Sequence, residues 1–197
     1  MILRPAFYDR PPLDRRSELS RLGLKPDLLT GLVLFGGQGS GVMLEIARRL
    51  NASDLNLQLI LLCGRNEKLA ARLRSLDARM PLHVAGFTTE VPYYMRLSDF
   101  FIGKPGPGSI SEAVAMGLPV IVERNAWTLP QERYNTEWVR EQGTGLVLRS
   151  FREIVPAVRE MLDPETLARF KANASKIDNR AVFEIPEILD KILENHR

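Results

Sequence analysis

Short apolar runs alternate with segments of helical periodicity along most of this 197-residue chain. The runs are rich in Val, Ile and Leu, as expected for strands that are buried on both faces. Six strands are predicted, at residues 32–35, 57–63, 82–87, 99–103, 119–122 and 145–148. Six helices are predicted before and between them, at residues 17–22, 42–50, 67–76, 91–97, 109–116 and 132–141. Strands separated by single helices favour a parallel sheet covered on both faces, so the fold class is a doubly wound α/β domain.

The pattern becomes entirely helical after Leu148. Helices are predicted at residues 152–162, 164–175 and 186–194, which gives the domain a helical C-terminal extension. The chain is 45% hydrophobic and 26% charged, a composition that suits one globular domain or at most two small ones.

The formal net charge of +3 is too small to indicate nucleic-acid binding. Basic residues nevertheless gather in two segments, which either form a solvated face or contact anionic lipid headgroups. These residues are Arg4, Arg10, Arg15, Arg16 and Arg21 near the start, then Arg65, Lys68, Arg72, Arg74 and Arg79.

Cysteine and histidine are scarce. Cys63 is the single cysteine, so no intrachain disulfide can form and a reducing compartment fits. It ends an apolar strand, which favours a buried structural residue over a nucleophile. The two histidines, His83 and His196, argue against a histidine metal site. No apolar run reaches transmembrane length, and the first residues do not read as a signal peptide.

Ligands of doubly wound sheets bind at the carboxyl ends of the strands, so the segments that follow the apolar runs are the candidate site. The first five strands are followed in turn by "FGGQGSG", "CGRN", "GFTTE", "GKPGPGS" and "ERNAWTLPQERYN". Glycine-rich loops after both the first and the fourth strand suggest one extended ligand that carries a phosphate group.

The loop after the fourth strand is stiff and poor in side chains. Gly106 and Gly108 allow close backbone approach, while Pro105 and Pro107 fix the loop's shape. Ser109 is expected to cap the following helix, since Glu112 lies at capping-box spacing from it. Bare amides at that helix start would bind an anion. A tight turn that uses Gly and Pro for geometry alone is the other interpretation.

Several named motifs are excluded. No Lys-Ser/Thr pair follows Gly41, so "GGQGSG" is not a Walker A loop, and Val42 and Leu44 stand where a dinucleotide fingerprint needs Gly. A mononucleotide remains compatible with the loop. The chain has no GxSxG motif, so a serine hydrolase has little support.

The segment "PQERYN" offers sugar-binding groups. Gln131, Glu132 and Asn135 carry amides and a carboxylate that could bridge vicinal hydroxyls, since each hydroxyl both donates and accepts. The alternative is an ordinary helix start after Pro130 with acidic residues in the first turn. The neighbouring phosphate loop favours hexose recognition.

In order and spacing, these motifs resemble the C-terminal half of monogalactosyldiacylglycerol synthases, a group related to the UDP-GlcNAc transferase of peptidoglycan synthesis. The likeness runs from about Arg4 onward and is most specific in the Lys-x-Gly-Pro-Gly loop with its following Glu, and in Gln-Glu-x-x-Asn. It implies a GT-B fold, in which two Rossmann-like domains enclose the active site. This chain would comprise a linker remnant at 1–16, the UDP-sugar domain at 17–182, and a last helix at 183–197 that crosses to the N-terminal domain.

The resemblance also implies residue roles. The backbone at Phe87 and Thr88 would face the uracil, and Glu112 would bind the ribose hydroxyls, leaving Ser109 to cap its helix alone. The two glycine loops would hold the diphosphate, with Lys104 offsetting its charge, and the Gln-Glu-x-x-Asn segment would hold the hexose. The full implied donor-binding set is Gly37, Gln38, Gly39, Arg65, Phe87, Thr88, Lys104, Gly106, Pro107, Gly108, Ser109, Glu112, Gln131, Glu132 and Asn135.

The implied activity is an inverting transfer of galactose or glucose from UDP-hexose to diacylglycerol, without a metal or other cofactor for donor binding. The protein would be cytoplasmic and peripheral at the inner face of the cell membrane, where an anionic surface is a further partner and nucleic acid is not. The family's N-terminal domain, which supplies the catalytic base and most of the lipid site, is not in the sequence. We therefore expect the chain to be inactive alone and to need that domain in cis or in trans.

Three other functions remain open at this point: a transferase for another lipid-linked acceptor such as a polyprenyl glycan precursor, a non-catalytic nucleotide-sugar subunit that recruits a membrane partner, and a UDP-sugar epimerase. The epimerase would be expected to bring acidic and histidine catalytic groups that are not found. Trp127 departs from the small residues that precede Gln-Glu in the plant synthases and is expected to narrow the sugar pocket.

Overall fold

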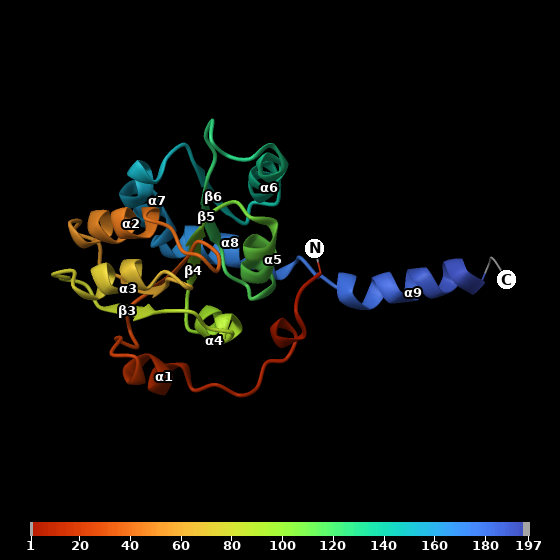
Figure 1. Ribbon diagram of the computed structural model, residues 1–197, viewed down its shortest axis with the longest axis horizontal. Helices are drawn as coiled ribbons and strands as arrows, with labels where there is room; N and C mark the ends of the chain where they lie inside the picture. Colours follow the sequence, from red (N-terminus) through yellow and green to blue (C-terminus); the bar gives the residue numbers. More distant parts are fainter. Residues whose placement is uncertain (1, 195–197) are drawn as a thin grey trace.

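The computed structural model describes residues 2–194, which form a doubly wound α/β domain with one projecting helix (Figure 1). The sheet has six parallel strands in the order β3-β2-β1-β4-β5-β6. The strands are β1 (Thr30–Leu34), β2 (Gln58–Leu62), β3 (Leu82–Ala85), β4 (Phe100–Gly103), β5 (Val120–Glu123) and β6 (Gly145–Leu148). The predicted fold class and all six strands are confirmed.

Side chains alternate between the two faces of the sheet because successive residues of a strand point in opposite directions. In β1, Val33 packs into the cluster beneath α2 (Val42–Asn51), α3 (Glu67–Arg74) and α7 (Ile154–Met161). Leu32 and Leu34 pack into the opposite cluster. That second cluster lies under α1 (Arg15–Arg21), α4 (Val91–Arg96), α5 (Pro107–Ala115) and α6 (Pro130–Glu141). Helix α8 (Pro164–Ser175) contributes residues to both clusters.

Helices α1, α5 and α6 each begin two residues before their predicted starts. Helix α5 begins at Pro107, two residues early, and Gly106 stands at its N-cap without a side-chain hydrogen bond. Ser109 therefore lies inside the first turn and does not cap the helix, because Pro107 at the first helical position supplies a preset φ and has no N–H to leave unpaired there.

The last helix, α9 (Ala181–Glu194), also begins earlier than its predicted start at Pro186. The helix continues through this proline although the ring removes one backbone hydrogen bond. No described residue of α9 is buried, so the carbonyl that loses its partner can be hydrated. Residues 195–197 of the segment 183–197, which include His196, lie outside the described residues, as does Met1 of the segment 1–16.

The segment before α1 packs along the domain rather than standing free. Leu3 and Phe7 are buried in the second cluster, and a short 3-10 helix covers Pro5–Phe7. The Tyr8 hydroxyl donates to the Asn179 carbonyl at 2.8 Å, and the Tyr8 ring meets Phe183 edge to face at 5.0 Å. The start of the described chain thus lies beside the base of α9 (Figure 1).

Asp99 joins α1 to the sheet. It directly precedes β4 and therefore lies at the amino ends of the strands, opposite the edge where the strands end. One carboxylate oxygen accepts from Arg15 of α1 at 2.7 Å and from the Thr30 amide of β1 at 2.9 Å. The other accepts from Lys171 of α8 at 3.1 Å. Since the Asp99 side chain is only 11% exposed, these partners take the place of water around its carboxylate.

We predict that Asp99→Asn lowers the free energy of unfolding by about 2 kcal/mol, because two cations lose their shared partner in a largely buried setting. Asp27→Asn is the matched control, since Asp27 also binds an arginine of α1 but is 78% exposed. Urea unfolding monitored by circular dichroism measures both variants. Equal effects would show that burial does not set the strength of the Asp99 contacts.

Candidate active site at the carboxyl edge of the sheet

The loops that follow β1 and β2 interlock at the carboxyl edge of the sheet. Gly36, Gly39 and Gly64 all have positive φ, which favours glycine. A Cβ atom at Gly64 would overlap the Gly37 carbonyl, and the Arg65 amide donates to that same carbonyl at 2.9 Å. The sequence places glycine here because the two backbones touch.

A first cavity of about 250 Å³ opens beside these loops. Its wall includes five of the residues predicted to bind the donor, namely Gly37, Phe87, Thr88, Ser109 and Glu112. They come from the loops after β1 and β3 and from the first turns of α5. The topology thus brings together residues that are up to 75 positions apart in the chain.

Glu112 is the acidic group of the first cavity. Its side chain is 20% exposed, and desolvation by burial raises the pKa of its carboxyl. The Arg4 guanidinium lies 3.4 Å from Glu112 Oε1 and lowers the same pKa. Arg4 was not predicted as a site residue, because the sequence gives no sign that the leader reaches this cavity.

A second cavity of about 270 Å³ holds the predicted residues Lys104 and Glu132. Lys104 Nζ lies 3.9 Å from Glu132 Oε1, and the Glu132 side chain is only 14% exposed. Asn135 does not line this cavity, but it donates to the Pro105 carbonyl at 2.8 Å and so ties α6 to the loop after β4. The hydrogen bond goes to the loop backbone, and the role expected for Asn135 in supporting Gln131 and Glu132 stays a prediction.

The loop between β5 and α6 is stiffened by a residue that the sequence analysis missed. Glu123, the last residue of β5, accepts from the Asn125 side chain and from the Phe151 amide, both at 2.6 Å. Asn125 Oδ1 in turn accepts from the Trp127 amide at 2.9 Å. The loop holds Trp127 at the rim of the second cavity with 92% of its surface exposed. Glu123 could have been found, because it ends a strand at the site edge.

Other predicted residues lie at the edge but not in these cavity walls. Arg65 stacks over the exposed Phe87 ring at 4.9 Å. Gln38 and Gln131 are exposed, and Gly39, Gly106 and Gly108 shape the loops without lining either cavity.

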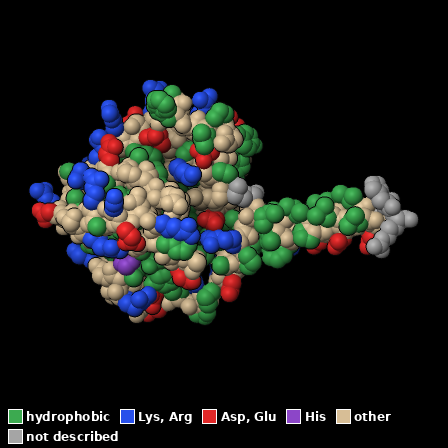
Figure 2. Space-filling model, viewed as in Figure 1, with side chains coloured by type: hydrophobic (Ala, Val, Ile, Leu, Met, Phe, Trp, Pro, Cys, Tyr) green, Lys and Arg blue, Asp and Glu red, His purple; other side chains and the backbone are tan. Residues whose placement is uncertain are grey.

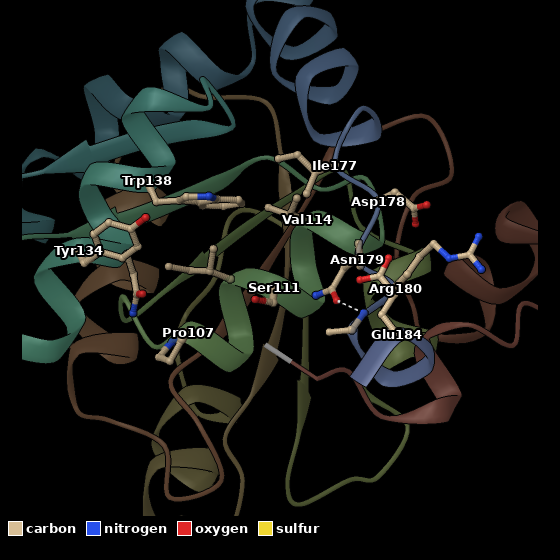
Figure 3. A pocket seen from close by; sticks show the side chains of 14 residues that line it. Pro107, Ser111, Val114, Tyr134, Trp138, Ile177, Asp178, Asn179, Arg180 and Glu184 are labelled. Atoms are coloured by element: carbon tan, nitrogen blue, oxygen red, sulfur yellow. Dashed lines mark hydrogen bonds between the residues drawn. The ribbon is translucent and has the colours of Figure 1, made fainter. Parts of the chain in front are cut away.

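Pro107 faces a larger cavity of about 360 Å³ on the far side of α5 (Figure 3). That cavity lies between α5, α6 and the segment that leads into α9, with Trp138 and Tyr134 projecting from α6. Apart from Pro107 and Asn135, it contains none of the predicted residues.

Cys63 is buried at the end of β2, as predicted, and burial raises the pKa of its thiol to about 11. The raised pKa and the burial of the thiol are typical of a structural cysteine. Within residues 2–194, no three His, Cys, Asp or Glu side chains gather in a way that could hold a metal ion.

The two cavities lie at the carboxyl edge of a doubly wound sheet, which is where domains of this class bind their ligands. Solved structures with the same fold include two bacterial glycosyltransferases. The chain aligns with MurG of Acinetobacter baumannii at a TM-score of 0.72 and 14% identity, covering 96% of this chain and 56% of that one. It aligns with WaaG, a glycosyltransferase involved in lipopolysaccharide biosynthesis, at 0.67 and 18%, covering 96% and 54%. At these identities the likeness shows the fold, which is the expected half of a GT-B enzyme.

Sequence comparison gives the family. Residues 32–187 match the family model of the glycosyltransferase family 28 C-terminal domain, and the chain belongs to that family. A curated relative, the chloroplastic monogalactosyldiacylglycerol synthase of Spinacia oleracea, is 37% identical over 203 aligned residues. The alignment covers 97% of this chain and 38% of the relative, so the chain spans about two fifths of that protein's length.

We predict that Gly64→Ala lowers stability more than Gly23→Ala does. Both glycines have positive φ, and the backbone strain should be about 1 kcal/mol at each. At Gly23 a Cβ meets nothing within 4 Å, whereas at Gly64 it would strike the Gly37 backbone. The overlap should add about 2 kcal/mol, measured by urea unfolding. If the two variants unfold alike, the loops are not held as closely as described.

Proposed function

We propose that this chain is the donor-binding domain of an inverting glycosyltransferase that transfers galactose or glucose from a UDP-sugar to diacylglycerol. The observation that carries the proposal is the first cavity, in which Glu112 lies with Phe87, Thr88 and Ser109 at the carboxyl edge of a parallel sheet. The monogalactosyldiacylglycerol synthases among its relatives support the choice of sugar and lipid.

In the proposed complex, the uridine occupies the first cavity. The Phe87 and Thr88 backbone faces the uracil, and the Glu112 carboxylate accepts hydrogen bonds from the ribose hydroxyls. The diphosphate lies between the loops after β1 and β4, where backbone amides and Lys104 offset its charge as the leaving group departs. Donor binding in this proposal uses no divalent metal and no other cofactor.

The hexose is assigned to the second cavity. Glu132 lies in its wall and Gln131 precedes it in the first turn of α6, where both can reach vicinal hydroxyls. Trp127 at the rim limits the space available to the sugar. Galactose and glucose differ in the configuration at C4, which is the position that these groups would have to distinguish.

The catalytic base and most of the acceptor site are assigned to a second domain that acts in cis or in trans. Helix α9 supports this assignment, because Ile185, Ile188, Leu189 and Ile192 are all at least 40% exposed. Figure 2 shows hydrophobic side chains along this projecting helix. An exposed apolar face of this length is expected to be covered by another surface.

We further propose that the complete enzyme is peripheral at the inner face of the cell membrane, where its lipid acceptor resides. Lys and Arg side chains that gather over α2 and α3 would favour an anionic surface (Figure 2). None of the helices within residues 2–194 is both long enough and apolar enough to cross a membrane.

Calorimetric titration of the 197-residue chain tests donor binding. We expect UDP, UDP-galactose and UDP-glucose to bind and ADP not to bind, with the ranking of UDP-galactose, UDP-glucose and UDP-GlcNAc identifying the sugar. Glu112→Gln should weaken UDP binding by about tenfold or more, because hydrogen bonds to a charged acceptor are lost. Glu45→Gln is the control, since Glu45 pairs with Arg49 on the surface of α2. Equal affinity for ADP and UDP would contradict the proposal.

The assignment of the base to a second domain predicts that the purified chain binds UDP-galactose but transfers no sugar to diacylglycerol. Radiolabelled UDP-galactose with diacylglycerol vesicles provides the assay, with a full-length relative as positive control. Sustained glycolipid synthesis by the purified chain would show that the base lies within these residues.

A further inference from the structure

Among the described residues of the N-terminal segment, Arg4 is the one that lines the first cavity. It is held there by its neighbours, since Leu3 and Phe7 are 3% and 1% exposed. The Arg4 guanidinium carbon lies 5.2 Å from the centre of the Phe7 ring, and one guanidinium nitrogen lies 3.4 Å from Glu112 Oε1. The placement of Arg4 is therefore fixed by buried anchors and by two contacts of its own.

The contact involves one nitrogen and one carboxylate oxygen. A carboxylate has about four acceptor positions, so Glu112 keeps the capacity to accept from both hydroxyls of a ribose while it remains paired with Arg4. Among the described residues, Arg4 and Glu112 are the ionisable groups in the wall of this cavity. Arg4 is also the charged group that acts on the pKa of Glu112.

We propose that Arg4 is a positioning residue for the nucleotide site, which keeps the Glu112 carboxylate in place as a charged acceptor for the ribose hydroxyls. This inference rests on the proposed function, because it assumes that a uridine nucleotide occupies the first cavity. The inference adds Arg4 to the proposed nucleotide-binding residues, although Arg4 belongs to the segment before α1 and not to the loops that follow the strands.

The proposal predicts a change in the pH dependence of UDP binding, because burial and Arg4 shift the pKa of Glu112 in opposite directions. Burial raises the pKa of Glu112 and Arg4 lowers it, so removal of Arg4 leaves burial unopposed and the pKa rises further. A protonated carboxyl loses its charge and part of its acceptor capacity. UDP binding should therefore fail at a higher pH during acidification when Arg4 is absent.

The test compares UDP dissociation constants of the full chain with those of Arg4→Ala, Arg4→Lys and Arg10→Ala from pH 8 to pH 5. At each pH, the dissociation constant of the variant is divided by that of the unchanged protein. This ratio cancels the effect of the titration of UDP itself. Arg10 is the matched control, because it fastens the same segment through the Ala115 carbonyl but does not line the cavity. Circular dichroism confirms that each variant is folded.

We expect Arg4→Ala to weaken binding by about threefold at pH 8, as for a partly exposed ion pair. The ratio should grow toward pH 5, by up to about tenfold for each unit that the pKa of Glu112 rises. Arg4→Lys keeps the charge, so its ratio should vary much less with pH. Arg10→Ala should stay close to the unchanged protein throughout.

Other results would overturn the inference. A ratio for Arg4→Ala that does not change with pH would give Arg4 a purely structural role, and the same loss in Arg10→Ala would assign the effect to the segment as a whole. Tighter UDP binding by Arg4→Ala would show that Arg4 competes with the ribose. Failure of the unchanged chain to bind UDP would instead overturn the proposed function, and this inference with it.

Discussion

The contact between the Gly37 and Gly64 backbones is the constraint on which the site depends. The two loops follow neighbouring strands, and a side chain at Gly64 would separate them. Their close approach leaves the Gly37 carbonyl bonded to the Arg65 amide and places the loop backbone along the first cavity. Gly36, Gly37, Gly64 and Gly86 therefore stand in the wall of this cavity, where their backbone can present dipoles to a ligand.

Few charges face the two cavities, and each cavity contains one ion pair. Arg4 lies beside Glu112 in the first cavity, and Lys104 lies near Glu132 in the second. In each pair the carboxylate is the more buried partner, with its side chain 20% or less exposed, while the cation is about half exposed. This arrangement leaves carboxylate oxygens as acceptors for hydroxyl groups and places cations at the rim, where a diphosphate would approach.

The N-terminal segment and α9 meet beside α5 and are joined through Tyr8. The N-terminal segment brings Arg4 to the first cavity, and α9 carries the exposed apolar face assigned to a second domain. If both assignments hold, a movement of the second domain would act close to the segment that holds Arg4. The donor site and the domain contact would then share a structural element, which agrees with an active site enclosed between two domains.

Most of the fold could be predicted from the sequence, because it follows from local patterns. Apolar runs alternating with helical periodicity gave the six strands and the parallel sheet, and the rule that ligands bind at the carboxyl ends of strands identified the loops. The helix starts were predicted less well. Ser109 is a residue type that favours an N-cap, but Pro107 begins α5 two residues earlier. Pro186 is typical of a helix start, but α9 begins at Ala181 and continues through this proline. The position of Cys63 at the end of an apolar run also predicted that it would be buried.

The sequence by itself therefore determined the architecture, the edge that carries the site and most of the residue types within it. Only the tertiary structure decided which of these residues share a cavity, and it separated Pro107 from Ser109 by placing them on opposite sides of one helix. It also brought Arg4 to Glu112 across 108 positions of the chain. The physical reason is that such contacts arise from the path of the segment over the packed domain, which buried anchors such as Leu3 and Phe7 fix, and no local periodicity encodes that path.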